Sequence, residues 1–429
     1  MKKVLILSYY FPPCNMTPSE RIYSWAKYLK QLGYYPIIVT RNWDFTITGF
    51  SDELKSSGTV PIYEKFDDYE VWYMPYKQSF KESLFTEQGN TITKTIYLFL
   101  SLWTNLLQVF TYRFSPLRVL YHKTEELIKT DKDIDQIIVS AYPYALFKFA
   151  YDLNKKYAID WIADYRDDWT SNEILNKSPI HRFLNRLNAF NEKKWLSTAK
   201  CFITVSDYYV EKIKKVIGQV KGYTIQNGYM PENYQHLNPN EHFDKFTITY
   251  VGSLYHTQPI ELFLLGVKTF IDTQNPTAFR VLFVGLKNNK DAYQRVCNEI
   301  KGYEAYFEFT ERVNKMEAID LQHKSNVLLI CTHTNMKGTP GSKLYEYIAL
   351  KKLVLITPGD KDIVEATLSQ TNQAIVAPTD KEVCKHLIAL YRSYTTQDHK
   401  EQHVNLNEIK SYDRYFQTER LGNILNNTI

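Results

Sequence analysis

The sequence predicts an α/β fold made of two doubly wound domains, and three observations predict it. The chain has 429 residues, more than one ordinary hydrophobic core accommodates. Short apolar runs alternate with helix-forming stretches along most of the chain, as in parallel sheets covered on both faces. A polar stretch at residues 231–245, with Pro, Asn and His, reads as a linker. We therefore expect one domain at residues 1–235 and a second at 245–410.

The first βαβ unit is the clearest element. Val4–Leu7 is an apolar run typical of a buried parallel strand. Thr17–Glu20 has the pattern of a helix capping box, with Pro at the first helical position, and Gly33 is placed to end that helix. Pro36–Thr40 is the next strand.

The same reasoning extends to the rest of the chain. Further strands are expected at 71–74, 136–140, 160–164, 201–205 and 223–225, and, in the second domain, at 248–252, 281–285, 306–309, 327–331, 354–357 and 374–377. Helices are expected at 117–129, 146–155 and 180–196, and Asn314–Glu317 is a second capping box.

Charge and cysteine content exclude several classes of protein. Lys and Arg exceed Asp and Glu by 52 to 47, a mildly basic balance that suits phosphate-bearing substrates or an anionic membrane surface. It is far from the balance of a nucleic-acid-binding protein, so no nucleic-acid partner is expected. The five cysteines are scattered and never spaced C-x-x-C, which predicts reduced thiols and no zinc site. We expect neither a metal nor a cofactor.

Residues 95–112 carry no charge, which raises the question of whether they span a membrane. Ser101, Thr104, Asn105 and Gln108 would form one polar stripe on a helix. A membrane-spanning helix has little use for such a stripe. An amphipathic helix, packed on a domain or lying at a bilayer interface, explains the pattern better.

The candidate site begins with "MKGTPGSKLYEYIALKKLVLIT". Gly341-Ser342-Lys343 start an apolar helix, where free N–H groups, the helix dipole and the Lys343 charge favour an anion. Glu346 lies on the same face and is placed to accept hydrogen bonds from sugar hydroxyls. An exposed Lys–Glu pair is the structural alternative. Gly338 and Gly341 favour the site because they let backbone approach a ligand closely.

Two other strand ends carry polar groups. Gly252 and Ser253 follow a predicted strand and would give a diphosphate access to backbone amides, and an ordinary turn is the structural alternative to this weak signal. Arg166-Asp167-Asp168-Trp169 also follows a strand. This cluster is either a buried ion pair or an acid, base or hydroxyl-binding group. No dinucleotide, Walker A, serine hydrolase or HExxH motif occurs in the sequence.

In this order, several segments resemble the family-4 glycosyltransferases of the GT-B fold, over nearly the whole chain. They are "ILSYYFPP" followed by Arg21, "ADYRDDW", "TIQNGY", "ITYVGSL" and "GSKLYEYIALKKLVLIT". The first two are similar to elements of a bacterial subgroup that acts on surface polysaccharides. The resemblance implies an α/β, GT-B architecture of two Rossmann-like doubly wound domains facing a cleft, with residues 411–429 forming a helix that crosses back to the first domain.

The resemblance also implies a function. The expected reaction is metal-independent, retaining transfer of a sugar from a UDP- or GDP-linked donor. The expected acceptor is a glycan linked to polyprenyl diphosphate, in capsule, O-antigen or exopolysaccharide biosynthesis. The expected location is cytoplasmic, at the inner face of the cytoplasmic membrane, with membrane contact through 95–112.

Site residues are carried over by position. The catalytic residues are expected to be Arg166, Asp167, Lys343 and Glu346. Donor-binding residues are expected to be Gly252, Ser253, Gly338, Thr339, Gly341, Ser342, Lys343 and Glu346. The acceptor or sugar side is expected to involve Tyr10, Asn15, Tyr142, Asp164, Arg166 and Asp167.

Departures from the family pattern leave two alternatives. Many members carry a Glu where Gly338 stands, and an Arg/Lys pair shortly after the loop at Gly252, where this chain reads Leu254–Pro259. One alternative is a non-catalytic GT-B relative that binds a nucleotide sugar or a partner. The other is a GT-B isomerase that converts a sugar nucleotide without an acceptor.

Overall fold

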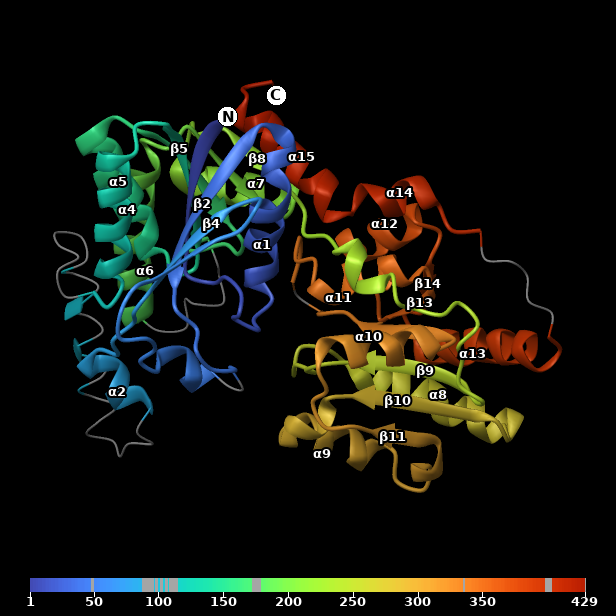
Figure 1. Cartoon of the computed structure of the whole chain (residues 1–429). Helices are drawn as coiled ribbons and strands as arrows, with labels where there is room; N and C mark the ends of the chain where they lie inside the picture. The colour runs from blue at the N-terminus through green and yellow to red at the C-terminus, as the bar shows by residue number, and fades with distance from the viewer. Residues whose placement is uncertain are drawn as a thin grey trace. The chain divides into compact units, whose positions relative to one another are not determined.

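A computed structural model (Figure 1) describes residues 1–47, 50–86, 96, 99–100, 103–104, 107, 115–171, 179–334, 336–397 and 403–428. The chain forms two compact units. Unit 1 comprises Met1–Gln226 and Gln417–Ile429, and unit 2 comprises Asn227–Phe416. The first unit therefore ends before the expected limit at residue 235, and the stretch at 231–245 lies within unit 2.

In its described residues, unit 1 is built on an eight-stranded sheet in the order β3-β4-β2-β1-β5-β6-β7-β8. All neighbouring strands are parallel except β3, which pairs antiparallel with β4. The strands are β1 Lys2–Ser8, β2 Tyr34–Arg41, β3 Ile62–Lys65, β4 Glu70–Met74, β5 Ile134–Ala141, β6 Asp160–Tyr165, β7 Cys201–Thr204 and β8 Gly222–Thr224.

Helices cover both faces of this sheet (Figure 1). Leu5 and Leu7 of β1 pack with α4, α5 and α7 on one face. Val4 and Ile6 alternate to the other face, where α1 and the end of α15 pack. The helices are α1 Pro18–Tyr28, η1 Leu29–Leu32, η2 Phe50–Leu54, α2 Phe80–Thr86, α4 Arg118–Thr130, α5 Ala145–Tyr157, α6 Pro179–Leu196, α7 Asp207–Ile217 and α15 Arg414–Leu425.

Unit 2 contains a parallel sheet whose described strands run β11-β10-β9-β12-β13-β14. Their bounds are β9 Phe246–Val251, β10 Phe279–Val284, β11 Phe307–Phe309, β12 Val327–Cys331, β13 Leu353–Thr357 and β14 Ala374–Val376. The helices are η4 Pro231–Tyr234, α8 Ile260–Gln274, η5 Leu286–Asn288, α9 Lys290–Glu299, η6 Glu304–Tyr306, α10 Lys315–Lys324, α11 Ser342–Leu350, α12 Ile363–Gln370, α13 Asp380–Thr395 and α14 Leu406–Ser411. Helices α8, α9 and α13 cover one face of the sheet, and α10, α11, α12 and α14 cover the other.

The two predicted capping boxes have opposite outcomes. Asn314 caps α10, because its side chain accepts a hydrogen bond from the Glu317 N–H. The prediction at Thr17 is wrong. Thr17 has helical backbone angles, and its side chain makes no cap hydrogen bond within the described chain. A backbone turn closes instead, in which Ser19 N–H donates to the Met16 carbonyl.

The stretch at 95–112 is described only in part. Ser101, Asn105 and Gln108 lie outside the described residues, so the predicted stripe is represented by Thr104 alone. Phe99 and Trp103 are exposed. Among the described residues, no helix has the length and apolar character needed to cross a bilayer.

Candidate functional site

Lys343 is the central residue of the candidate site in unit 2. It belongs to the first turn of α11, and its side chain is half-buried. Its Nζ lies 4.0 Å from the ring centroid of Tyr250 and 3.4 Å from the Ser253 carbonyl oxygen. Burial lowers the pKa of Lys343 to about 8. Among the described residues no carboxylate lies at ion-pair distance from Lys343, although the charge of Glu346, one turn later, raises its pKa in part.

The loop after β9 is shaped to let this lysine approach. Gly252 has φ +85°, a conformation that side chains other than glycine rarely adopt. A Cβ at this position would lie 3.3 Å from Cε of Lys343. Tyr250, below the lysine, donates its hydroxyl to the Ser253 carbonyl at 2.7 Å. The structure thus brings together Gly252, Ser253 and Lys343, which are separated by about ninety residues of sequence.

The start of α11 is open. Gly341 is the N-cap residue, and as a glycine it has no side chain to cap the helix. Gly341 is exposed, and a Cβ added to it would meet no described atom within 4 Å. Because the first N–H groups of a helix have no intrahelical partners, this terminus can receive an anion. Glu346 follows one turn later and is half-buried.

The loop before α11 carries a carboxylate that sequence reasoning missed. Gly338 has φ +68°, and its N–H donates to the carboxylate of Asp362. Thr339 donates its hydroxyl to the Lys337 carbonyl. An acidic group therefore stands next to the position where many family-4 members carry a glutamate. Asp362 is far from Gly338 in sequence, and no motif marked it.

A second missed residue supports the loop that lacks the Arg/Lys pair. Arg295 of α9 forms a two-point ion pair with Glu261, at 2.6 Å for each contact. It also donates to the carbonyls of Tyr255 and Gln258. Arg295, a cation on α9, thus holds the loop at Tyr255–Gln258 in place.

In unit 1, Asp164 is part of a buried ion pair. Its side chain is fully buried, and its Oδ1 accepts from Arg21 Nη2 at 2.9 Å. Its Oδ2 accepts from the Ser140 hydroxyl at 2.7 Å. Arg21 also donates to the Ile225 carbonyl. With both oxygens engaged and no exposed surface, Asp164 is placed as a structural anchor rather than as an acceptor contact.

Arg166 and Asp167 lie together at the end of β6. Arg166 Nε donates to Asp167 Oδ2 at 2.9 Å, and the Asp167 side chain is 53% exposed. The guanidinium lies 6.0 Å from the Tyr10 ring centroid. Tyr10 itself is buried and donates its hydroxyl to Glu53. Of the predicted acceptor-side residues, Tyr10, Arg166 and Asp167 therefore lie together, and Asp167 forms the exposed edge of this trio.

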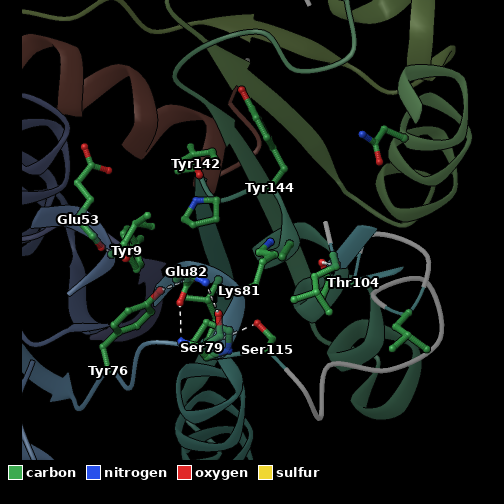
Figure 2. Close-up of a pocket in the computed structure, with 18 of the residues that line it drawn as sticks. Tyr9, Glu53, Tyr76, Ser79, Lys81, Glu82, Thr104, Ser115, Tyr142 and Tyr144 are labelled. Atoms are coloured by element: carbon green, nitrogen blue, oxygen red, sulfur yellow. Dashed lines mark hydrogen bonds between the residues drawn. The ribbon is translucent and has the colours of Figure 1, made fainter. Parts of the chain in front are cut away.

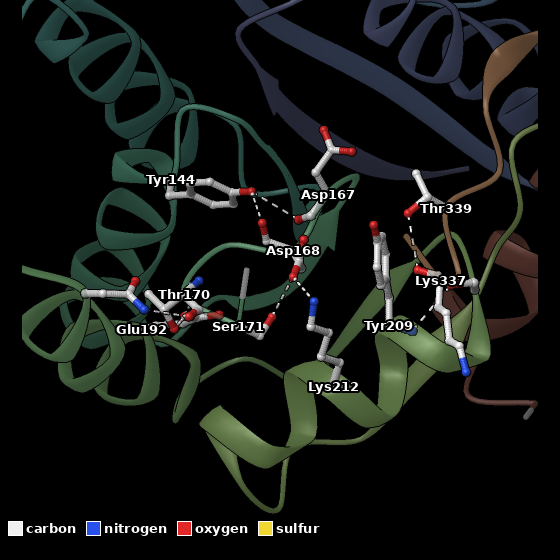
Figure 3. Close-up of polar contacts among 12 residues, drawn as sticks. Tyr144, Asp167, Asp168, Thr170, Ser171, Glu192, Tyr209, Lys212, Lys337 and Thr339 are labelled. Atoms are coloured by element: carbon white, nitrogen blue, oxygen red, sulfur yellow. Dashed lines mark hydrogen bonds and ion pairs between the residues drawn. The ribbon is translucent and has the colours of Figure 1, made fainter. Parts of the chain in front are cut away.

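Other polar residues stabilise the loop that follows β6. Figure 3 shows Tyr144 donating to the carbonyls of Asp167 and Asp168, and Lys212 pairing with the Asp168 carboxylate. Glu192 is fully buried and accepts hydrogen bonds from Thr170 and Tyr165. Burial raises the pKa of Glu192 to about 7, although these hydrogen bonds lower it in part.

The remaining predicted residues, Asn15 and Tyr142, lie apart from this trio. Asn15 is exposed, and its amide exchanges two hydrogen bonds with the Ile47 backbone, which braces the loop after β1. Tyr142 is 44% exposed and lines a cavity of about 430 Å³ within unit 1 (Figure 2). Sequence analysis missed this cavity because its walls come from separate segments near residues 53, 80, 104, 116, 143 and 191.

The described residues contain no group of three or more His, Cys, Asp or Glu side chains arranged to hold a metal ion.

Comparisons of sequence give no relative. No protein-family model matches the chain. No curated protein matches it either.

Comparisons of structure find similar proteins. A trehalose 6-phosphate synthase from Burkholderia multivorans superposes with a TM-score of 0.64 at 12% identity, covering 100% of this chain and 99% of its own. A UDP-forming trehalose-phosphate synthase from Burkholderia xenovorans, in complex with glucose-6-phosphate, has a TM-score of 0.63 at 10% identity, covering 99% and 100%. A sucrose-phosphate synthase from Thermosynechococcus elongatus has a TM-score of 0.61 at 12% identity, covering 100% and 99%.

These full-length matches define the class of fold. The chain has the GT-B fold of two Rossmann-like units, as the sequence predicts. Identities of this size establish the architecture, and the chemistry is argued from the residues.

Proposed function

We propose that the protein is a glycosyltransferase that takes a sugar from a nucleotide-sugar donor. One observation carries the proposal: in a GT-B fold, a half-buried lysine without an ion pair stands at an open helix start, beside a glycine loop. A half-buried cation with no carboxylate at ion-pair distance is favoured further when a ligand supplies negative charge. A nucleoside diphosphate supplies it.

The same geometry suits the chemistry of transfer. When the sugar leaves, negative charge grows on the diphosphate. Lys343 and the first N–H groups of α11 would stabilise that charge because they are fixed before the reaction begins. We propose that Glu346 binds the ribose, while Gly252, Ser253, Gly338, Thr339, Gly341 and Ser342 let backbone groups reach the donor.

The finer assignment follows the resemblance to family 4. We propose retention of anomeric configuration without a metal, with Arg166 and Asp167 contacting the reacting sugar or the acceptor. UDP is the donor nucleotide to test first, because the Burkholderia enzymes are UDP-forming. GDP is the second.

A thermal-shift screen of UDP, GDP and their sugars tests the donor. A ligand that binds only the folded state raises the melting temperature. Lys343→Ala should abolish the shift given by the best nucleotide. Lys352→Ala is the matched control, since Lys352 is another lysine of unit 2 whose pKa burial lowers. No shift with any nucleotide, or equal shifts in both variants, would contradict the proposal.

Two alternatives predict different products. An isomerase would convert the sugar nucleotide with no acceptor present. A non-catalytic relative would bind it and release it unchanged, and its support is Gly338 and the absent Arg/Lys pair. The carboxylate of Asp362 beside Gly338 favours an enzyme. Incubation of the donor with membrane extracts, followed by mass spectrometry of lipid-linked glycans, detects transfer. NMR of the sugar nucleotide incubated without an acceptor then separates an isomerase, which changes the sugar, from a non-catalytic relative, which does not.

The acceptor side is proposed to be a polyprenyl-diphosphate-linked glycan of surface polysaccharide biosynthesis, reached at the cytoplasmic membrane face. Phe99 and Trp103 are 65% and 55% exposed, as an interfacial segment requires. Helix α6 adds an exposed face of aromatic and basic residues, which suits an anionic lipid surface. This face comprises Arg182, Phe183, Arg186, Phe190, Lys193 and Lys194.

Flotation with anionic liposomes tests the membrane contact. The variants Phe99→Ser/Trp103→Ser and Phe183→Ser/Phe190→Ser should each reduce the floated fraction. Exposed Tyr255 lies in unit 2, and Tyr255→Ser is the matched control that should leave flotation unchanged. If both double variants float like the wild type, neither segment contacts the membrane.

A further inference from the structure

The cavity of unit 1 is a second candidate binding site. Its volume of about 430 Å³ lies in the range of small-molecule sites. Its walls come from η2, α2, the segment before α4, the turn before α5 and α6, together with Tyr9, Tyr76, Trp169 and the described residues Leu100, Thr104 and Leu107. Figure 2 labels several of these residues. All of these belong to unit 1, so the cavity is a property of that unit alone.

One polar atom in its lining has no partner. Asn191 is 2% exposed, and its Oδ1 accepts no hydrogen bond from any described residue. Buried acceptors in folded proteins are nearly always paired, because leaving one unpaired costs the full desolvation of the group. A hydroxyl or N–H group of a bound molecule would satisfy Asn191.

Lys81 is a second polar group in the lining. Its side chain is half-buried, and burial lowers its pKa. Within the described residues it makes neither an ion pair nor a hydrogen bond. It is a donor that a ligand oxygen would complete.

The carboxylates of the lining are already engaged. Glu53 accepts from the Tyr10 hydroxyl at 2.8 Å. Glu82 accepts from the Tyr76 hydroxyl and from the Ser79 N–H, each at 2.8 Å. Both carboxylates are held by the fold, and neither neutralises Lys81 at ion-pair distance.

The charges in and directly behind the lining balance. Arg41 is buried, with its guanidinium carbon 3.9 Å from the Tyr76 ring centroid. The oxygens that accept from it belong to hydroxyl and backbone carbonyl groups, including Ser57 Oγ at 3.0 Å. The lining itself holds one cation, Lys81, and two carboxylates, Glu53 and Glu82, with Arg41 behind the Tyr76 ring. No excess of positive charge remains for a phosphate dianion.

Aromatic rings form the rigid part of the wall. Trp169 stacks on Tyr144 at 4.8 Å between ring centroids, and on Trp195 at 5.8 Å. Apolar and aromatic walls with a few convergent polar groups are typical of sites for small organic ligands. The C–H faces of a sugar ring pack against such walls, while its hydroxyls pair with the polar groups.

We propose that this cavity binds an uncharged saccharide, whose hydroxyls donate to Asn191 Oδ1 and accept from Lys81 Nζ. The inference rests on the proposed function in that the saccharide would belong to the acceptor. It differs from the glucose-6-phosphate bound by the Burkholderia xenovorans enzyme. A free glycan and the sugar of a lipid-linked glycan offer the same chemistry, and the experiment separates them.

Saturation-transfer NMR on the intact protein is the test. The probes are the methyl glycosides of glucose, galactose, mannose, rhamnose and N-acetylglucosamine, with glucose-6-phosphate in parallel. We expect transfer to at least one neutral glycoside and weaker transfer to glucose-6-phosphate. Asn191→Leu should weaken that affinity by about tenfold, as loss of one hydrogen bond to a buried acceptor implies. Lys81→Met should weaken it several-fold.

Thr124→Val is the matched control. Thr124 Oγ1 is another buried oxygen without a described partner, and it lies outside the cavity lining. This variant should bind the glycosides like the wild type. Tighter binding of an octyl glycoside than of the matching methyl glycoside assigns the sugar to a lipid-linked glycan, and equal binding assigns it to a free one.

The inference is wrong if no neutral glycoside gives a signal that Asn191→Leu or Lys81→Met reduces, or if glucose-6-phosphate binds better. Titration with UDP and GDP keeps this separate from the proposed function. Glycoside binding without nucleotide binding overturns the proposed transfer alone. Nucleotide binding without glycoside binding overturns this inference alone.

Discussion

The two units differ in how the charged side chains at the carboxyl ends of their central strands are paired. In unit 1, Asp164 is paired with Arg21 and Asp168 with Lys212. In unit 2, Lys343 has a ring face and a carbonyl oxygen beside it, and the described residues offer it no carboxylate at ion-pair distance.

The difference shows how to distinguish scaffold from site. A charge whose partners are all protein groups holds elements together, and its removal damages folding. A charge that the fold leaves incomplete points to a ligand, and its removal damages binding. The four predictions that follow separate these two roles.

The largest effect is expected from the buried pair of unit 1. Arg21→Met would leave Asp164 buried without its cation, which costs about 3–5 kcal/mol of unfolding free energy. Urea denaturation measures the loss. Arg21→Met/Asp164→Leu should recover much of it, because no lone buried charge remains. Lys214→Met breaks an exposed pair with Glu211 and is the control, expected to cost under about 1 kcal/mol. A small loss for Arg21→Met would make Asp164 available for another role.

Glu192 gives a stability effect that depends on pH. Its pKa is about 7 in the folded protein, against an ordinary value of 4.5, so between these values the folded state holds a proton that the unfolded state has released. Stability should therefore fall as pH rises from about 4.5 to 7, by about 3 kcal/mol in total, and then level off. Glu192→Gln should remove this fall.

Glu125 is the opposite case and the control for Glu192. Although burial raises its pKa, hydrogen bonds from Lys156 and Tyr157 lower it to about 2. Its stabilising contribution is present above pH 4.5 and is lost as pH falls towards 2. Glu125→Gln should thus change the acid limb and leave the range from 4.5 to 7 as in the wild type. Identical profiles for Glu192→Gln and wild type would refute the assignment.

The lysine of unit 2 should affect binding rather than folding. Because burial lowers the pKa of Lys343 to about 8, the cation is lost as pH rises through that value. Affinity for UDP or GDP, measured by calorimetry, should fall above pH 8 by up to about tenfold per pH unit. Lys343→Arg keeps its charge and should flatten this dependence. Parallel curves for the two proteins would exclude a role for the lysine charge.

The smallest effect separates two glycines. Gly252→Ala and Gly33→Ala both force a side chain into left-handed backbone, at φ +85° and +90°, and each should cost about 1 kcal/mol of stability. A Cβ at Gly33 meets no described atom within 4 Å, whereas one at Gly252 contacts Lys343. Only Gly252→Ala should therefore weaken nucleotide binding, by a few-fold. Equal nucleotide affinities in both variants would show that the loop at Gly252 is not part of the nucleotide site.

Much of the fold is predictable from the sequence because its elements have local sequence patterns. The buried parallel strands, from β1 to β13, appear as apolar runs bounded by turn residues. Strand β3 escaped detection because all four of its residues are exposed, so it has no apolar face to reveal it. The strand expected at 248–252 ends one residue early, at Val251, because Gly252 adopts positive φ.

The candidate site is predictable only where its parts adjoin in sequence. The helix start at Gly341–Lys343 was found from local spacing. The partners of Asp164 were not, since nothing in the sequence links it to Arg21, which lies 143 residues away. Asp362, Arg295 and the cavity were missed for the same reason. Each is created by tertiary contacts between distant segments.

The route of the chain imposes an order of assembly. Unit 2 is one continuous segment, whereas unit 1 also needs Gln417–Ile429. Leu421, Ile424 and Leu425 pack in its core, and Gln136 donates to the Leu425 carbonyl. On the ribosome, Met1–Gln226 must therefore wait for Gln417–Ile429, which is made only after the whole of unit 2. A fragment ending at Gln226 should remain incomplete until a separate peptide of residues 414–429 is supplied to it.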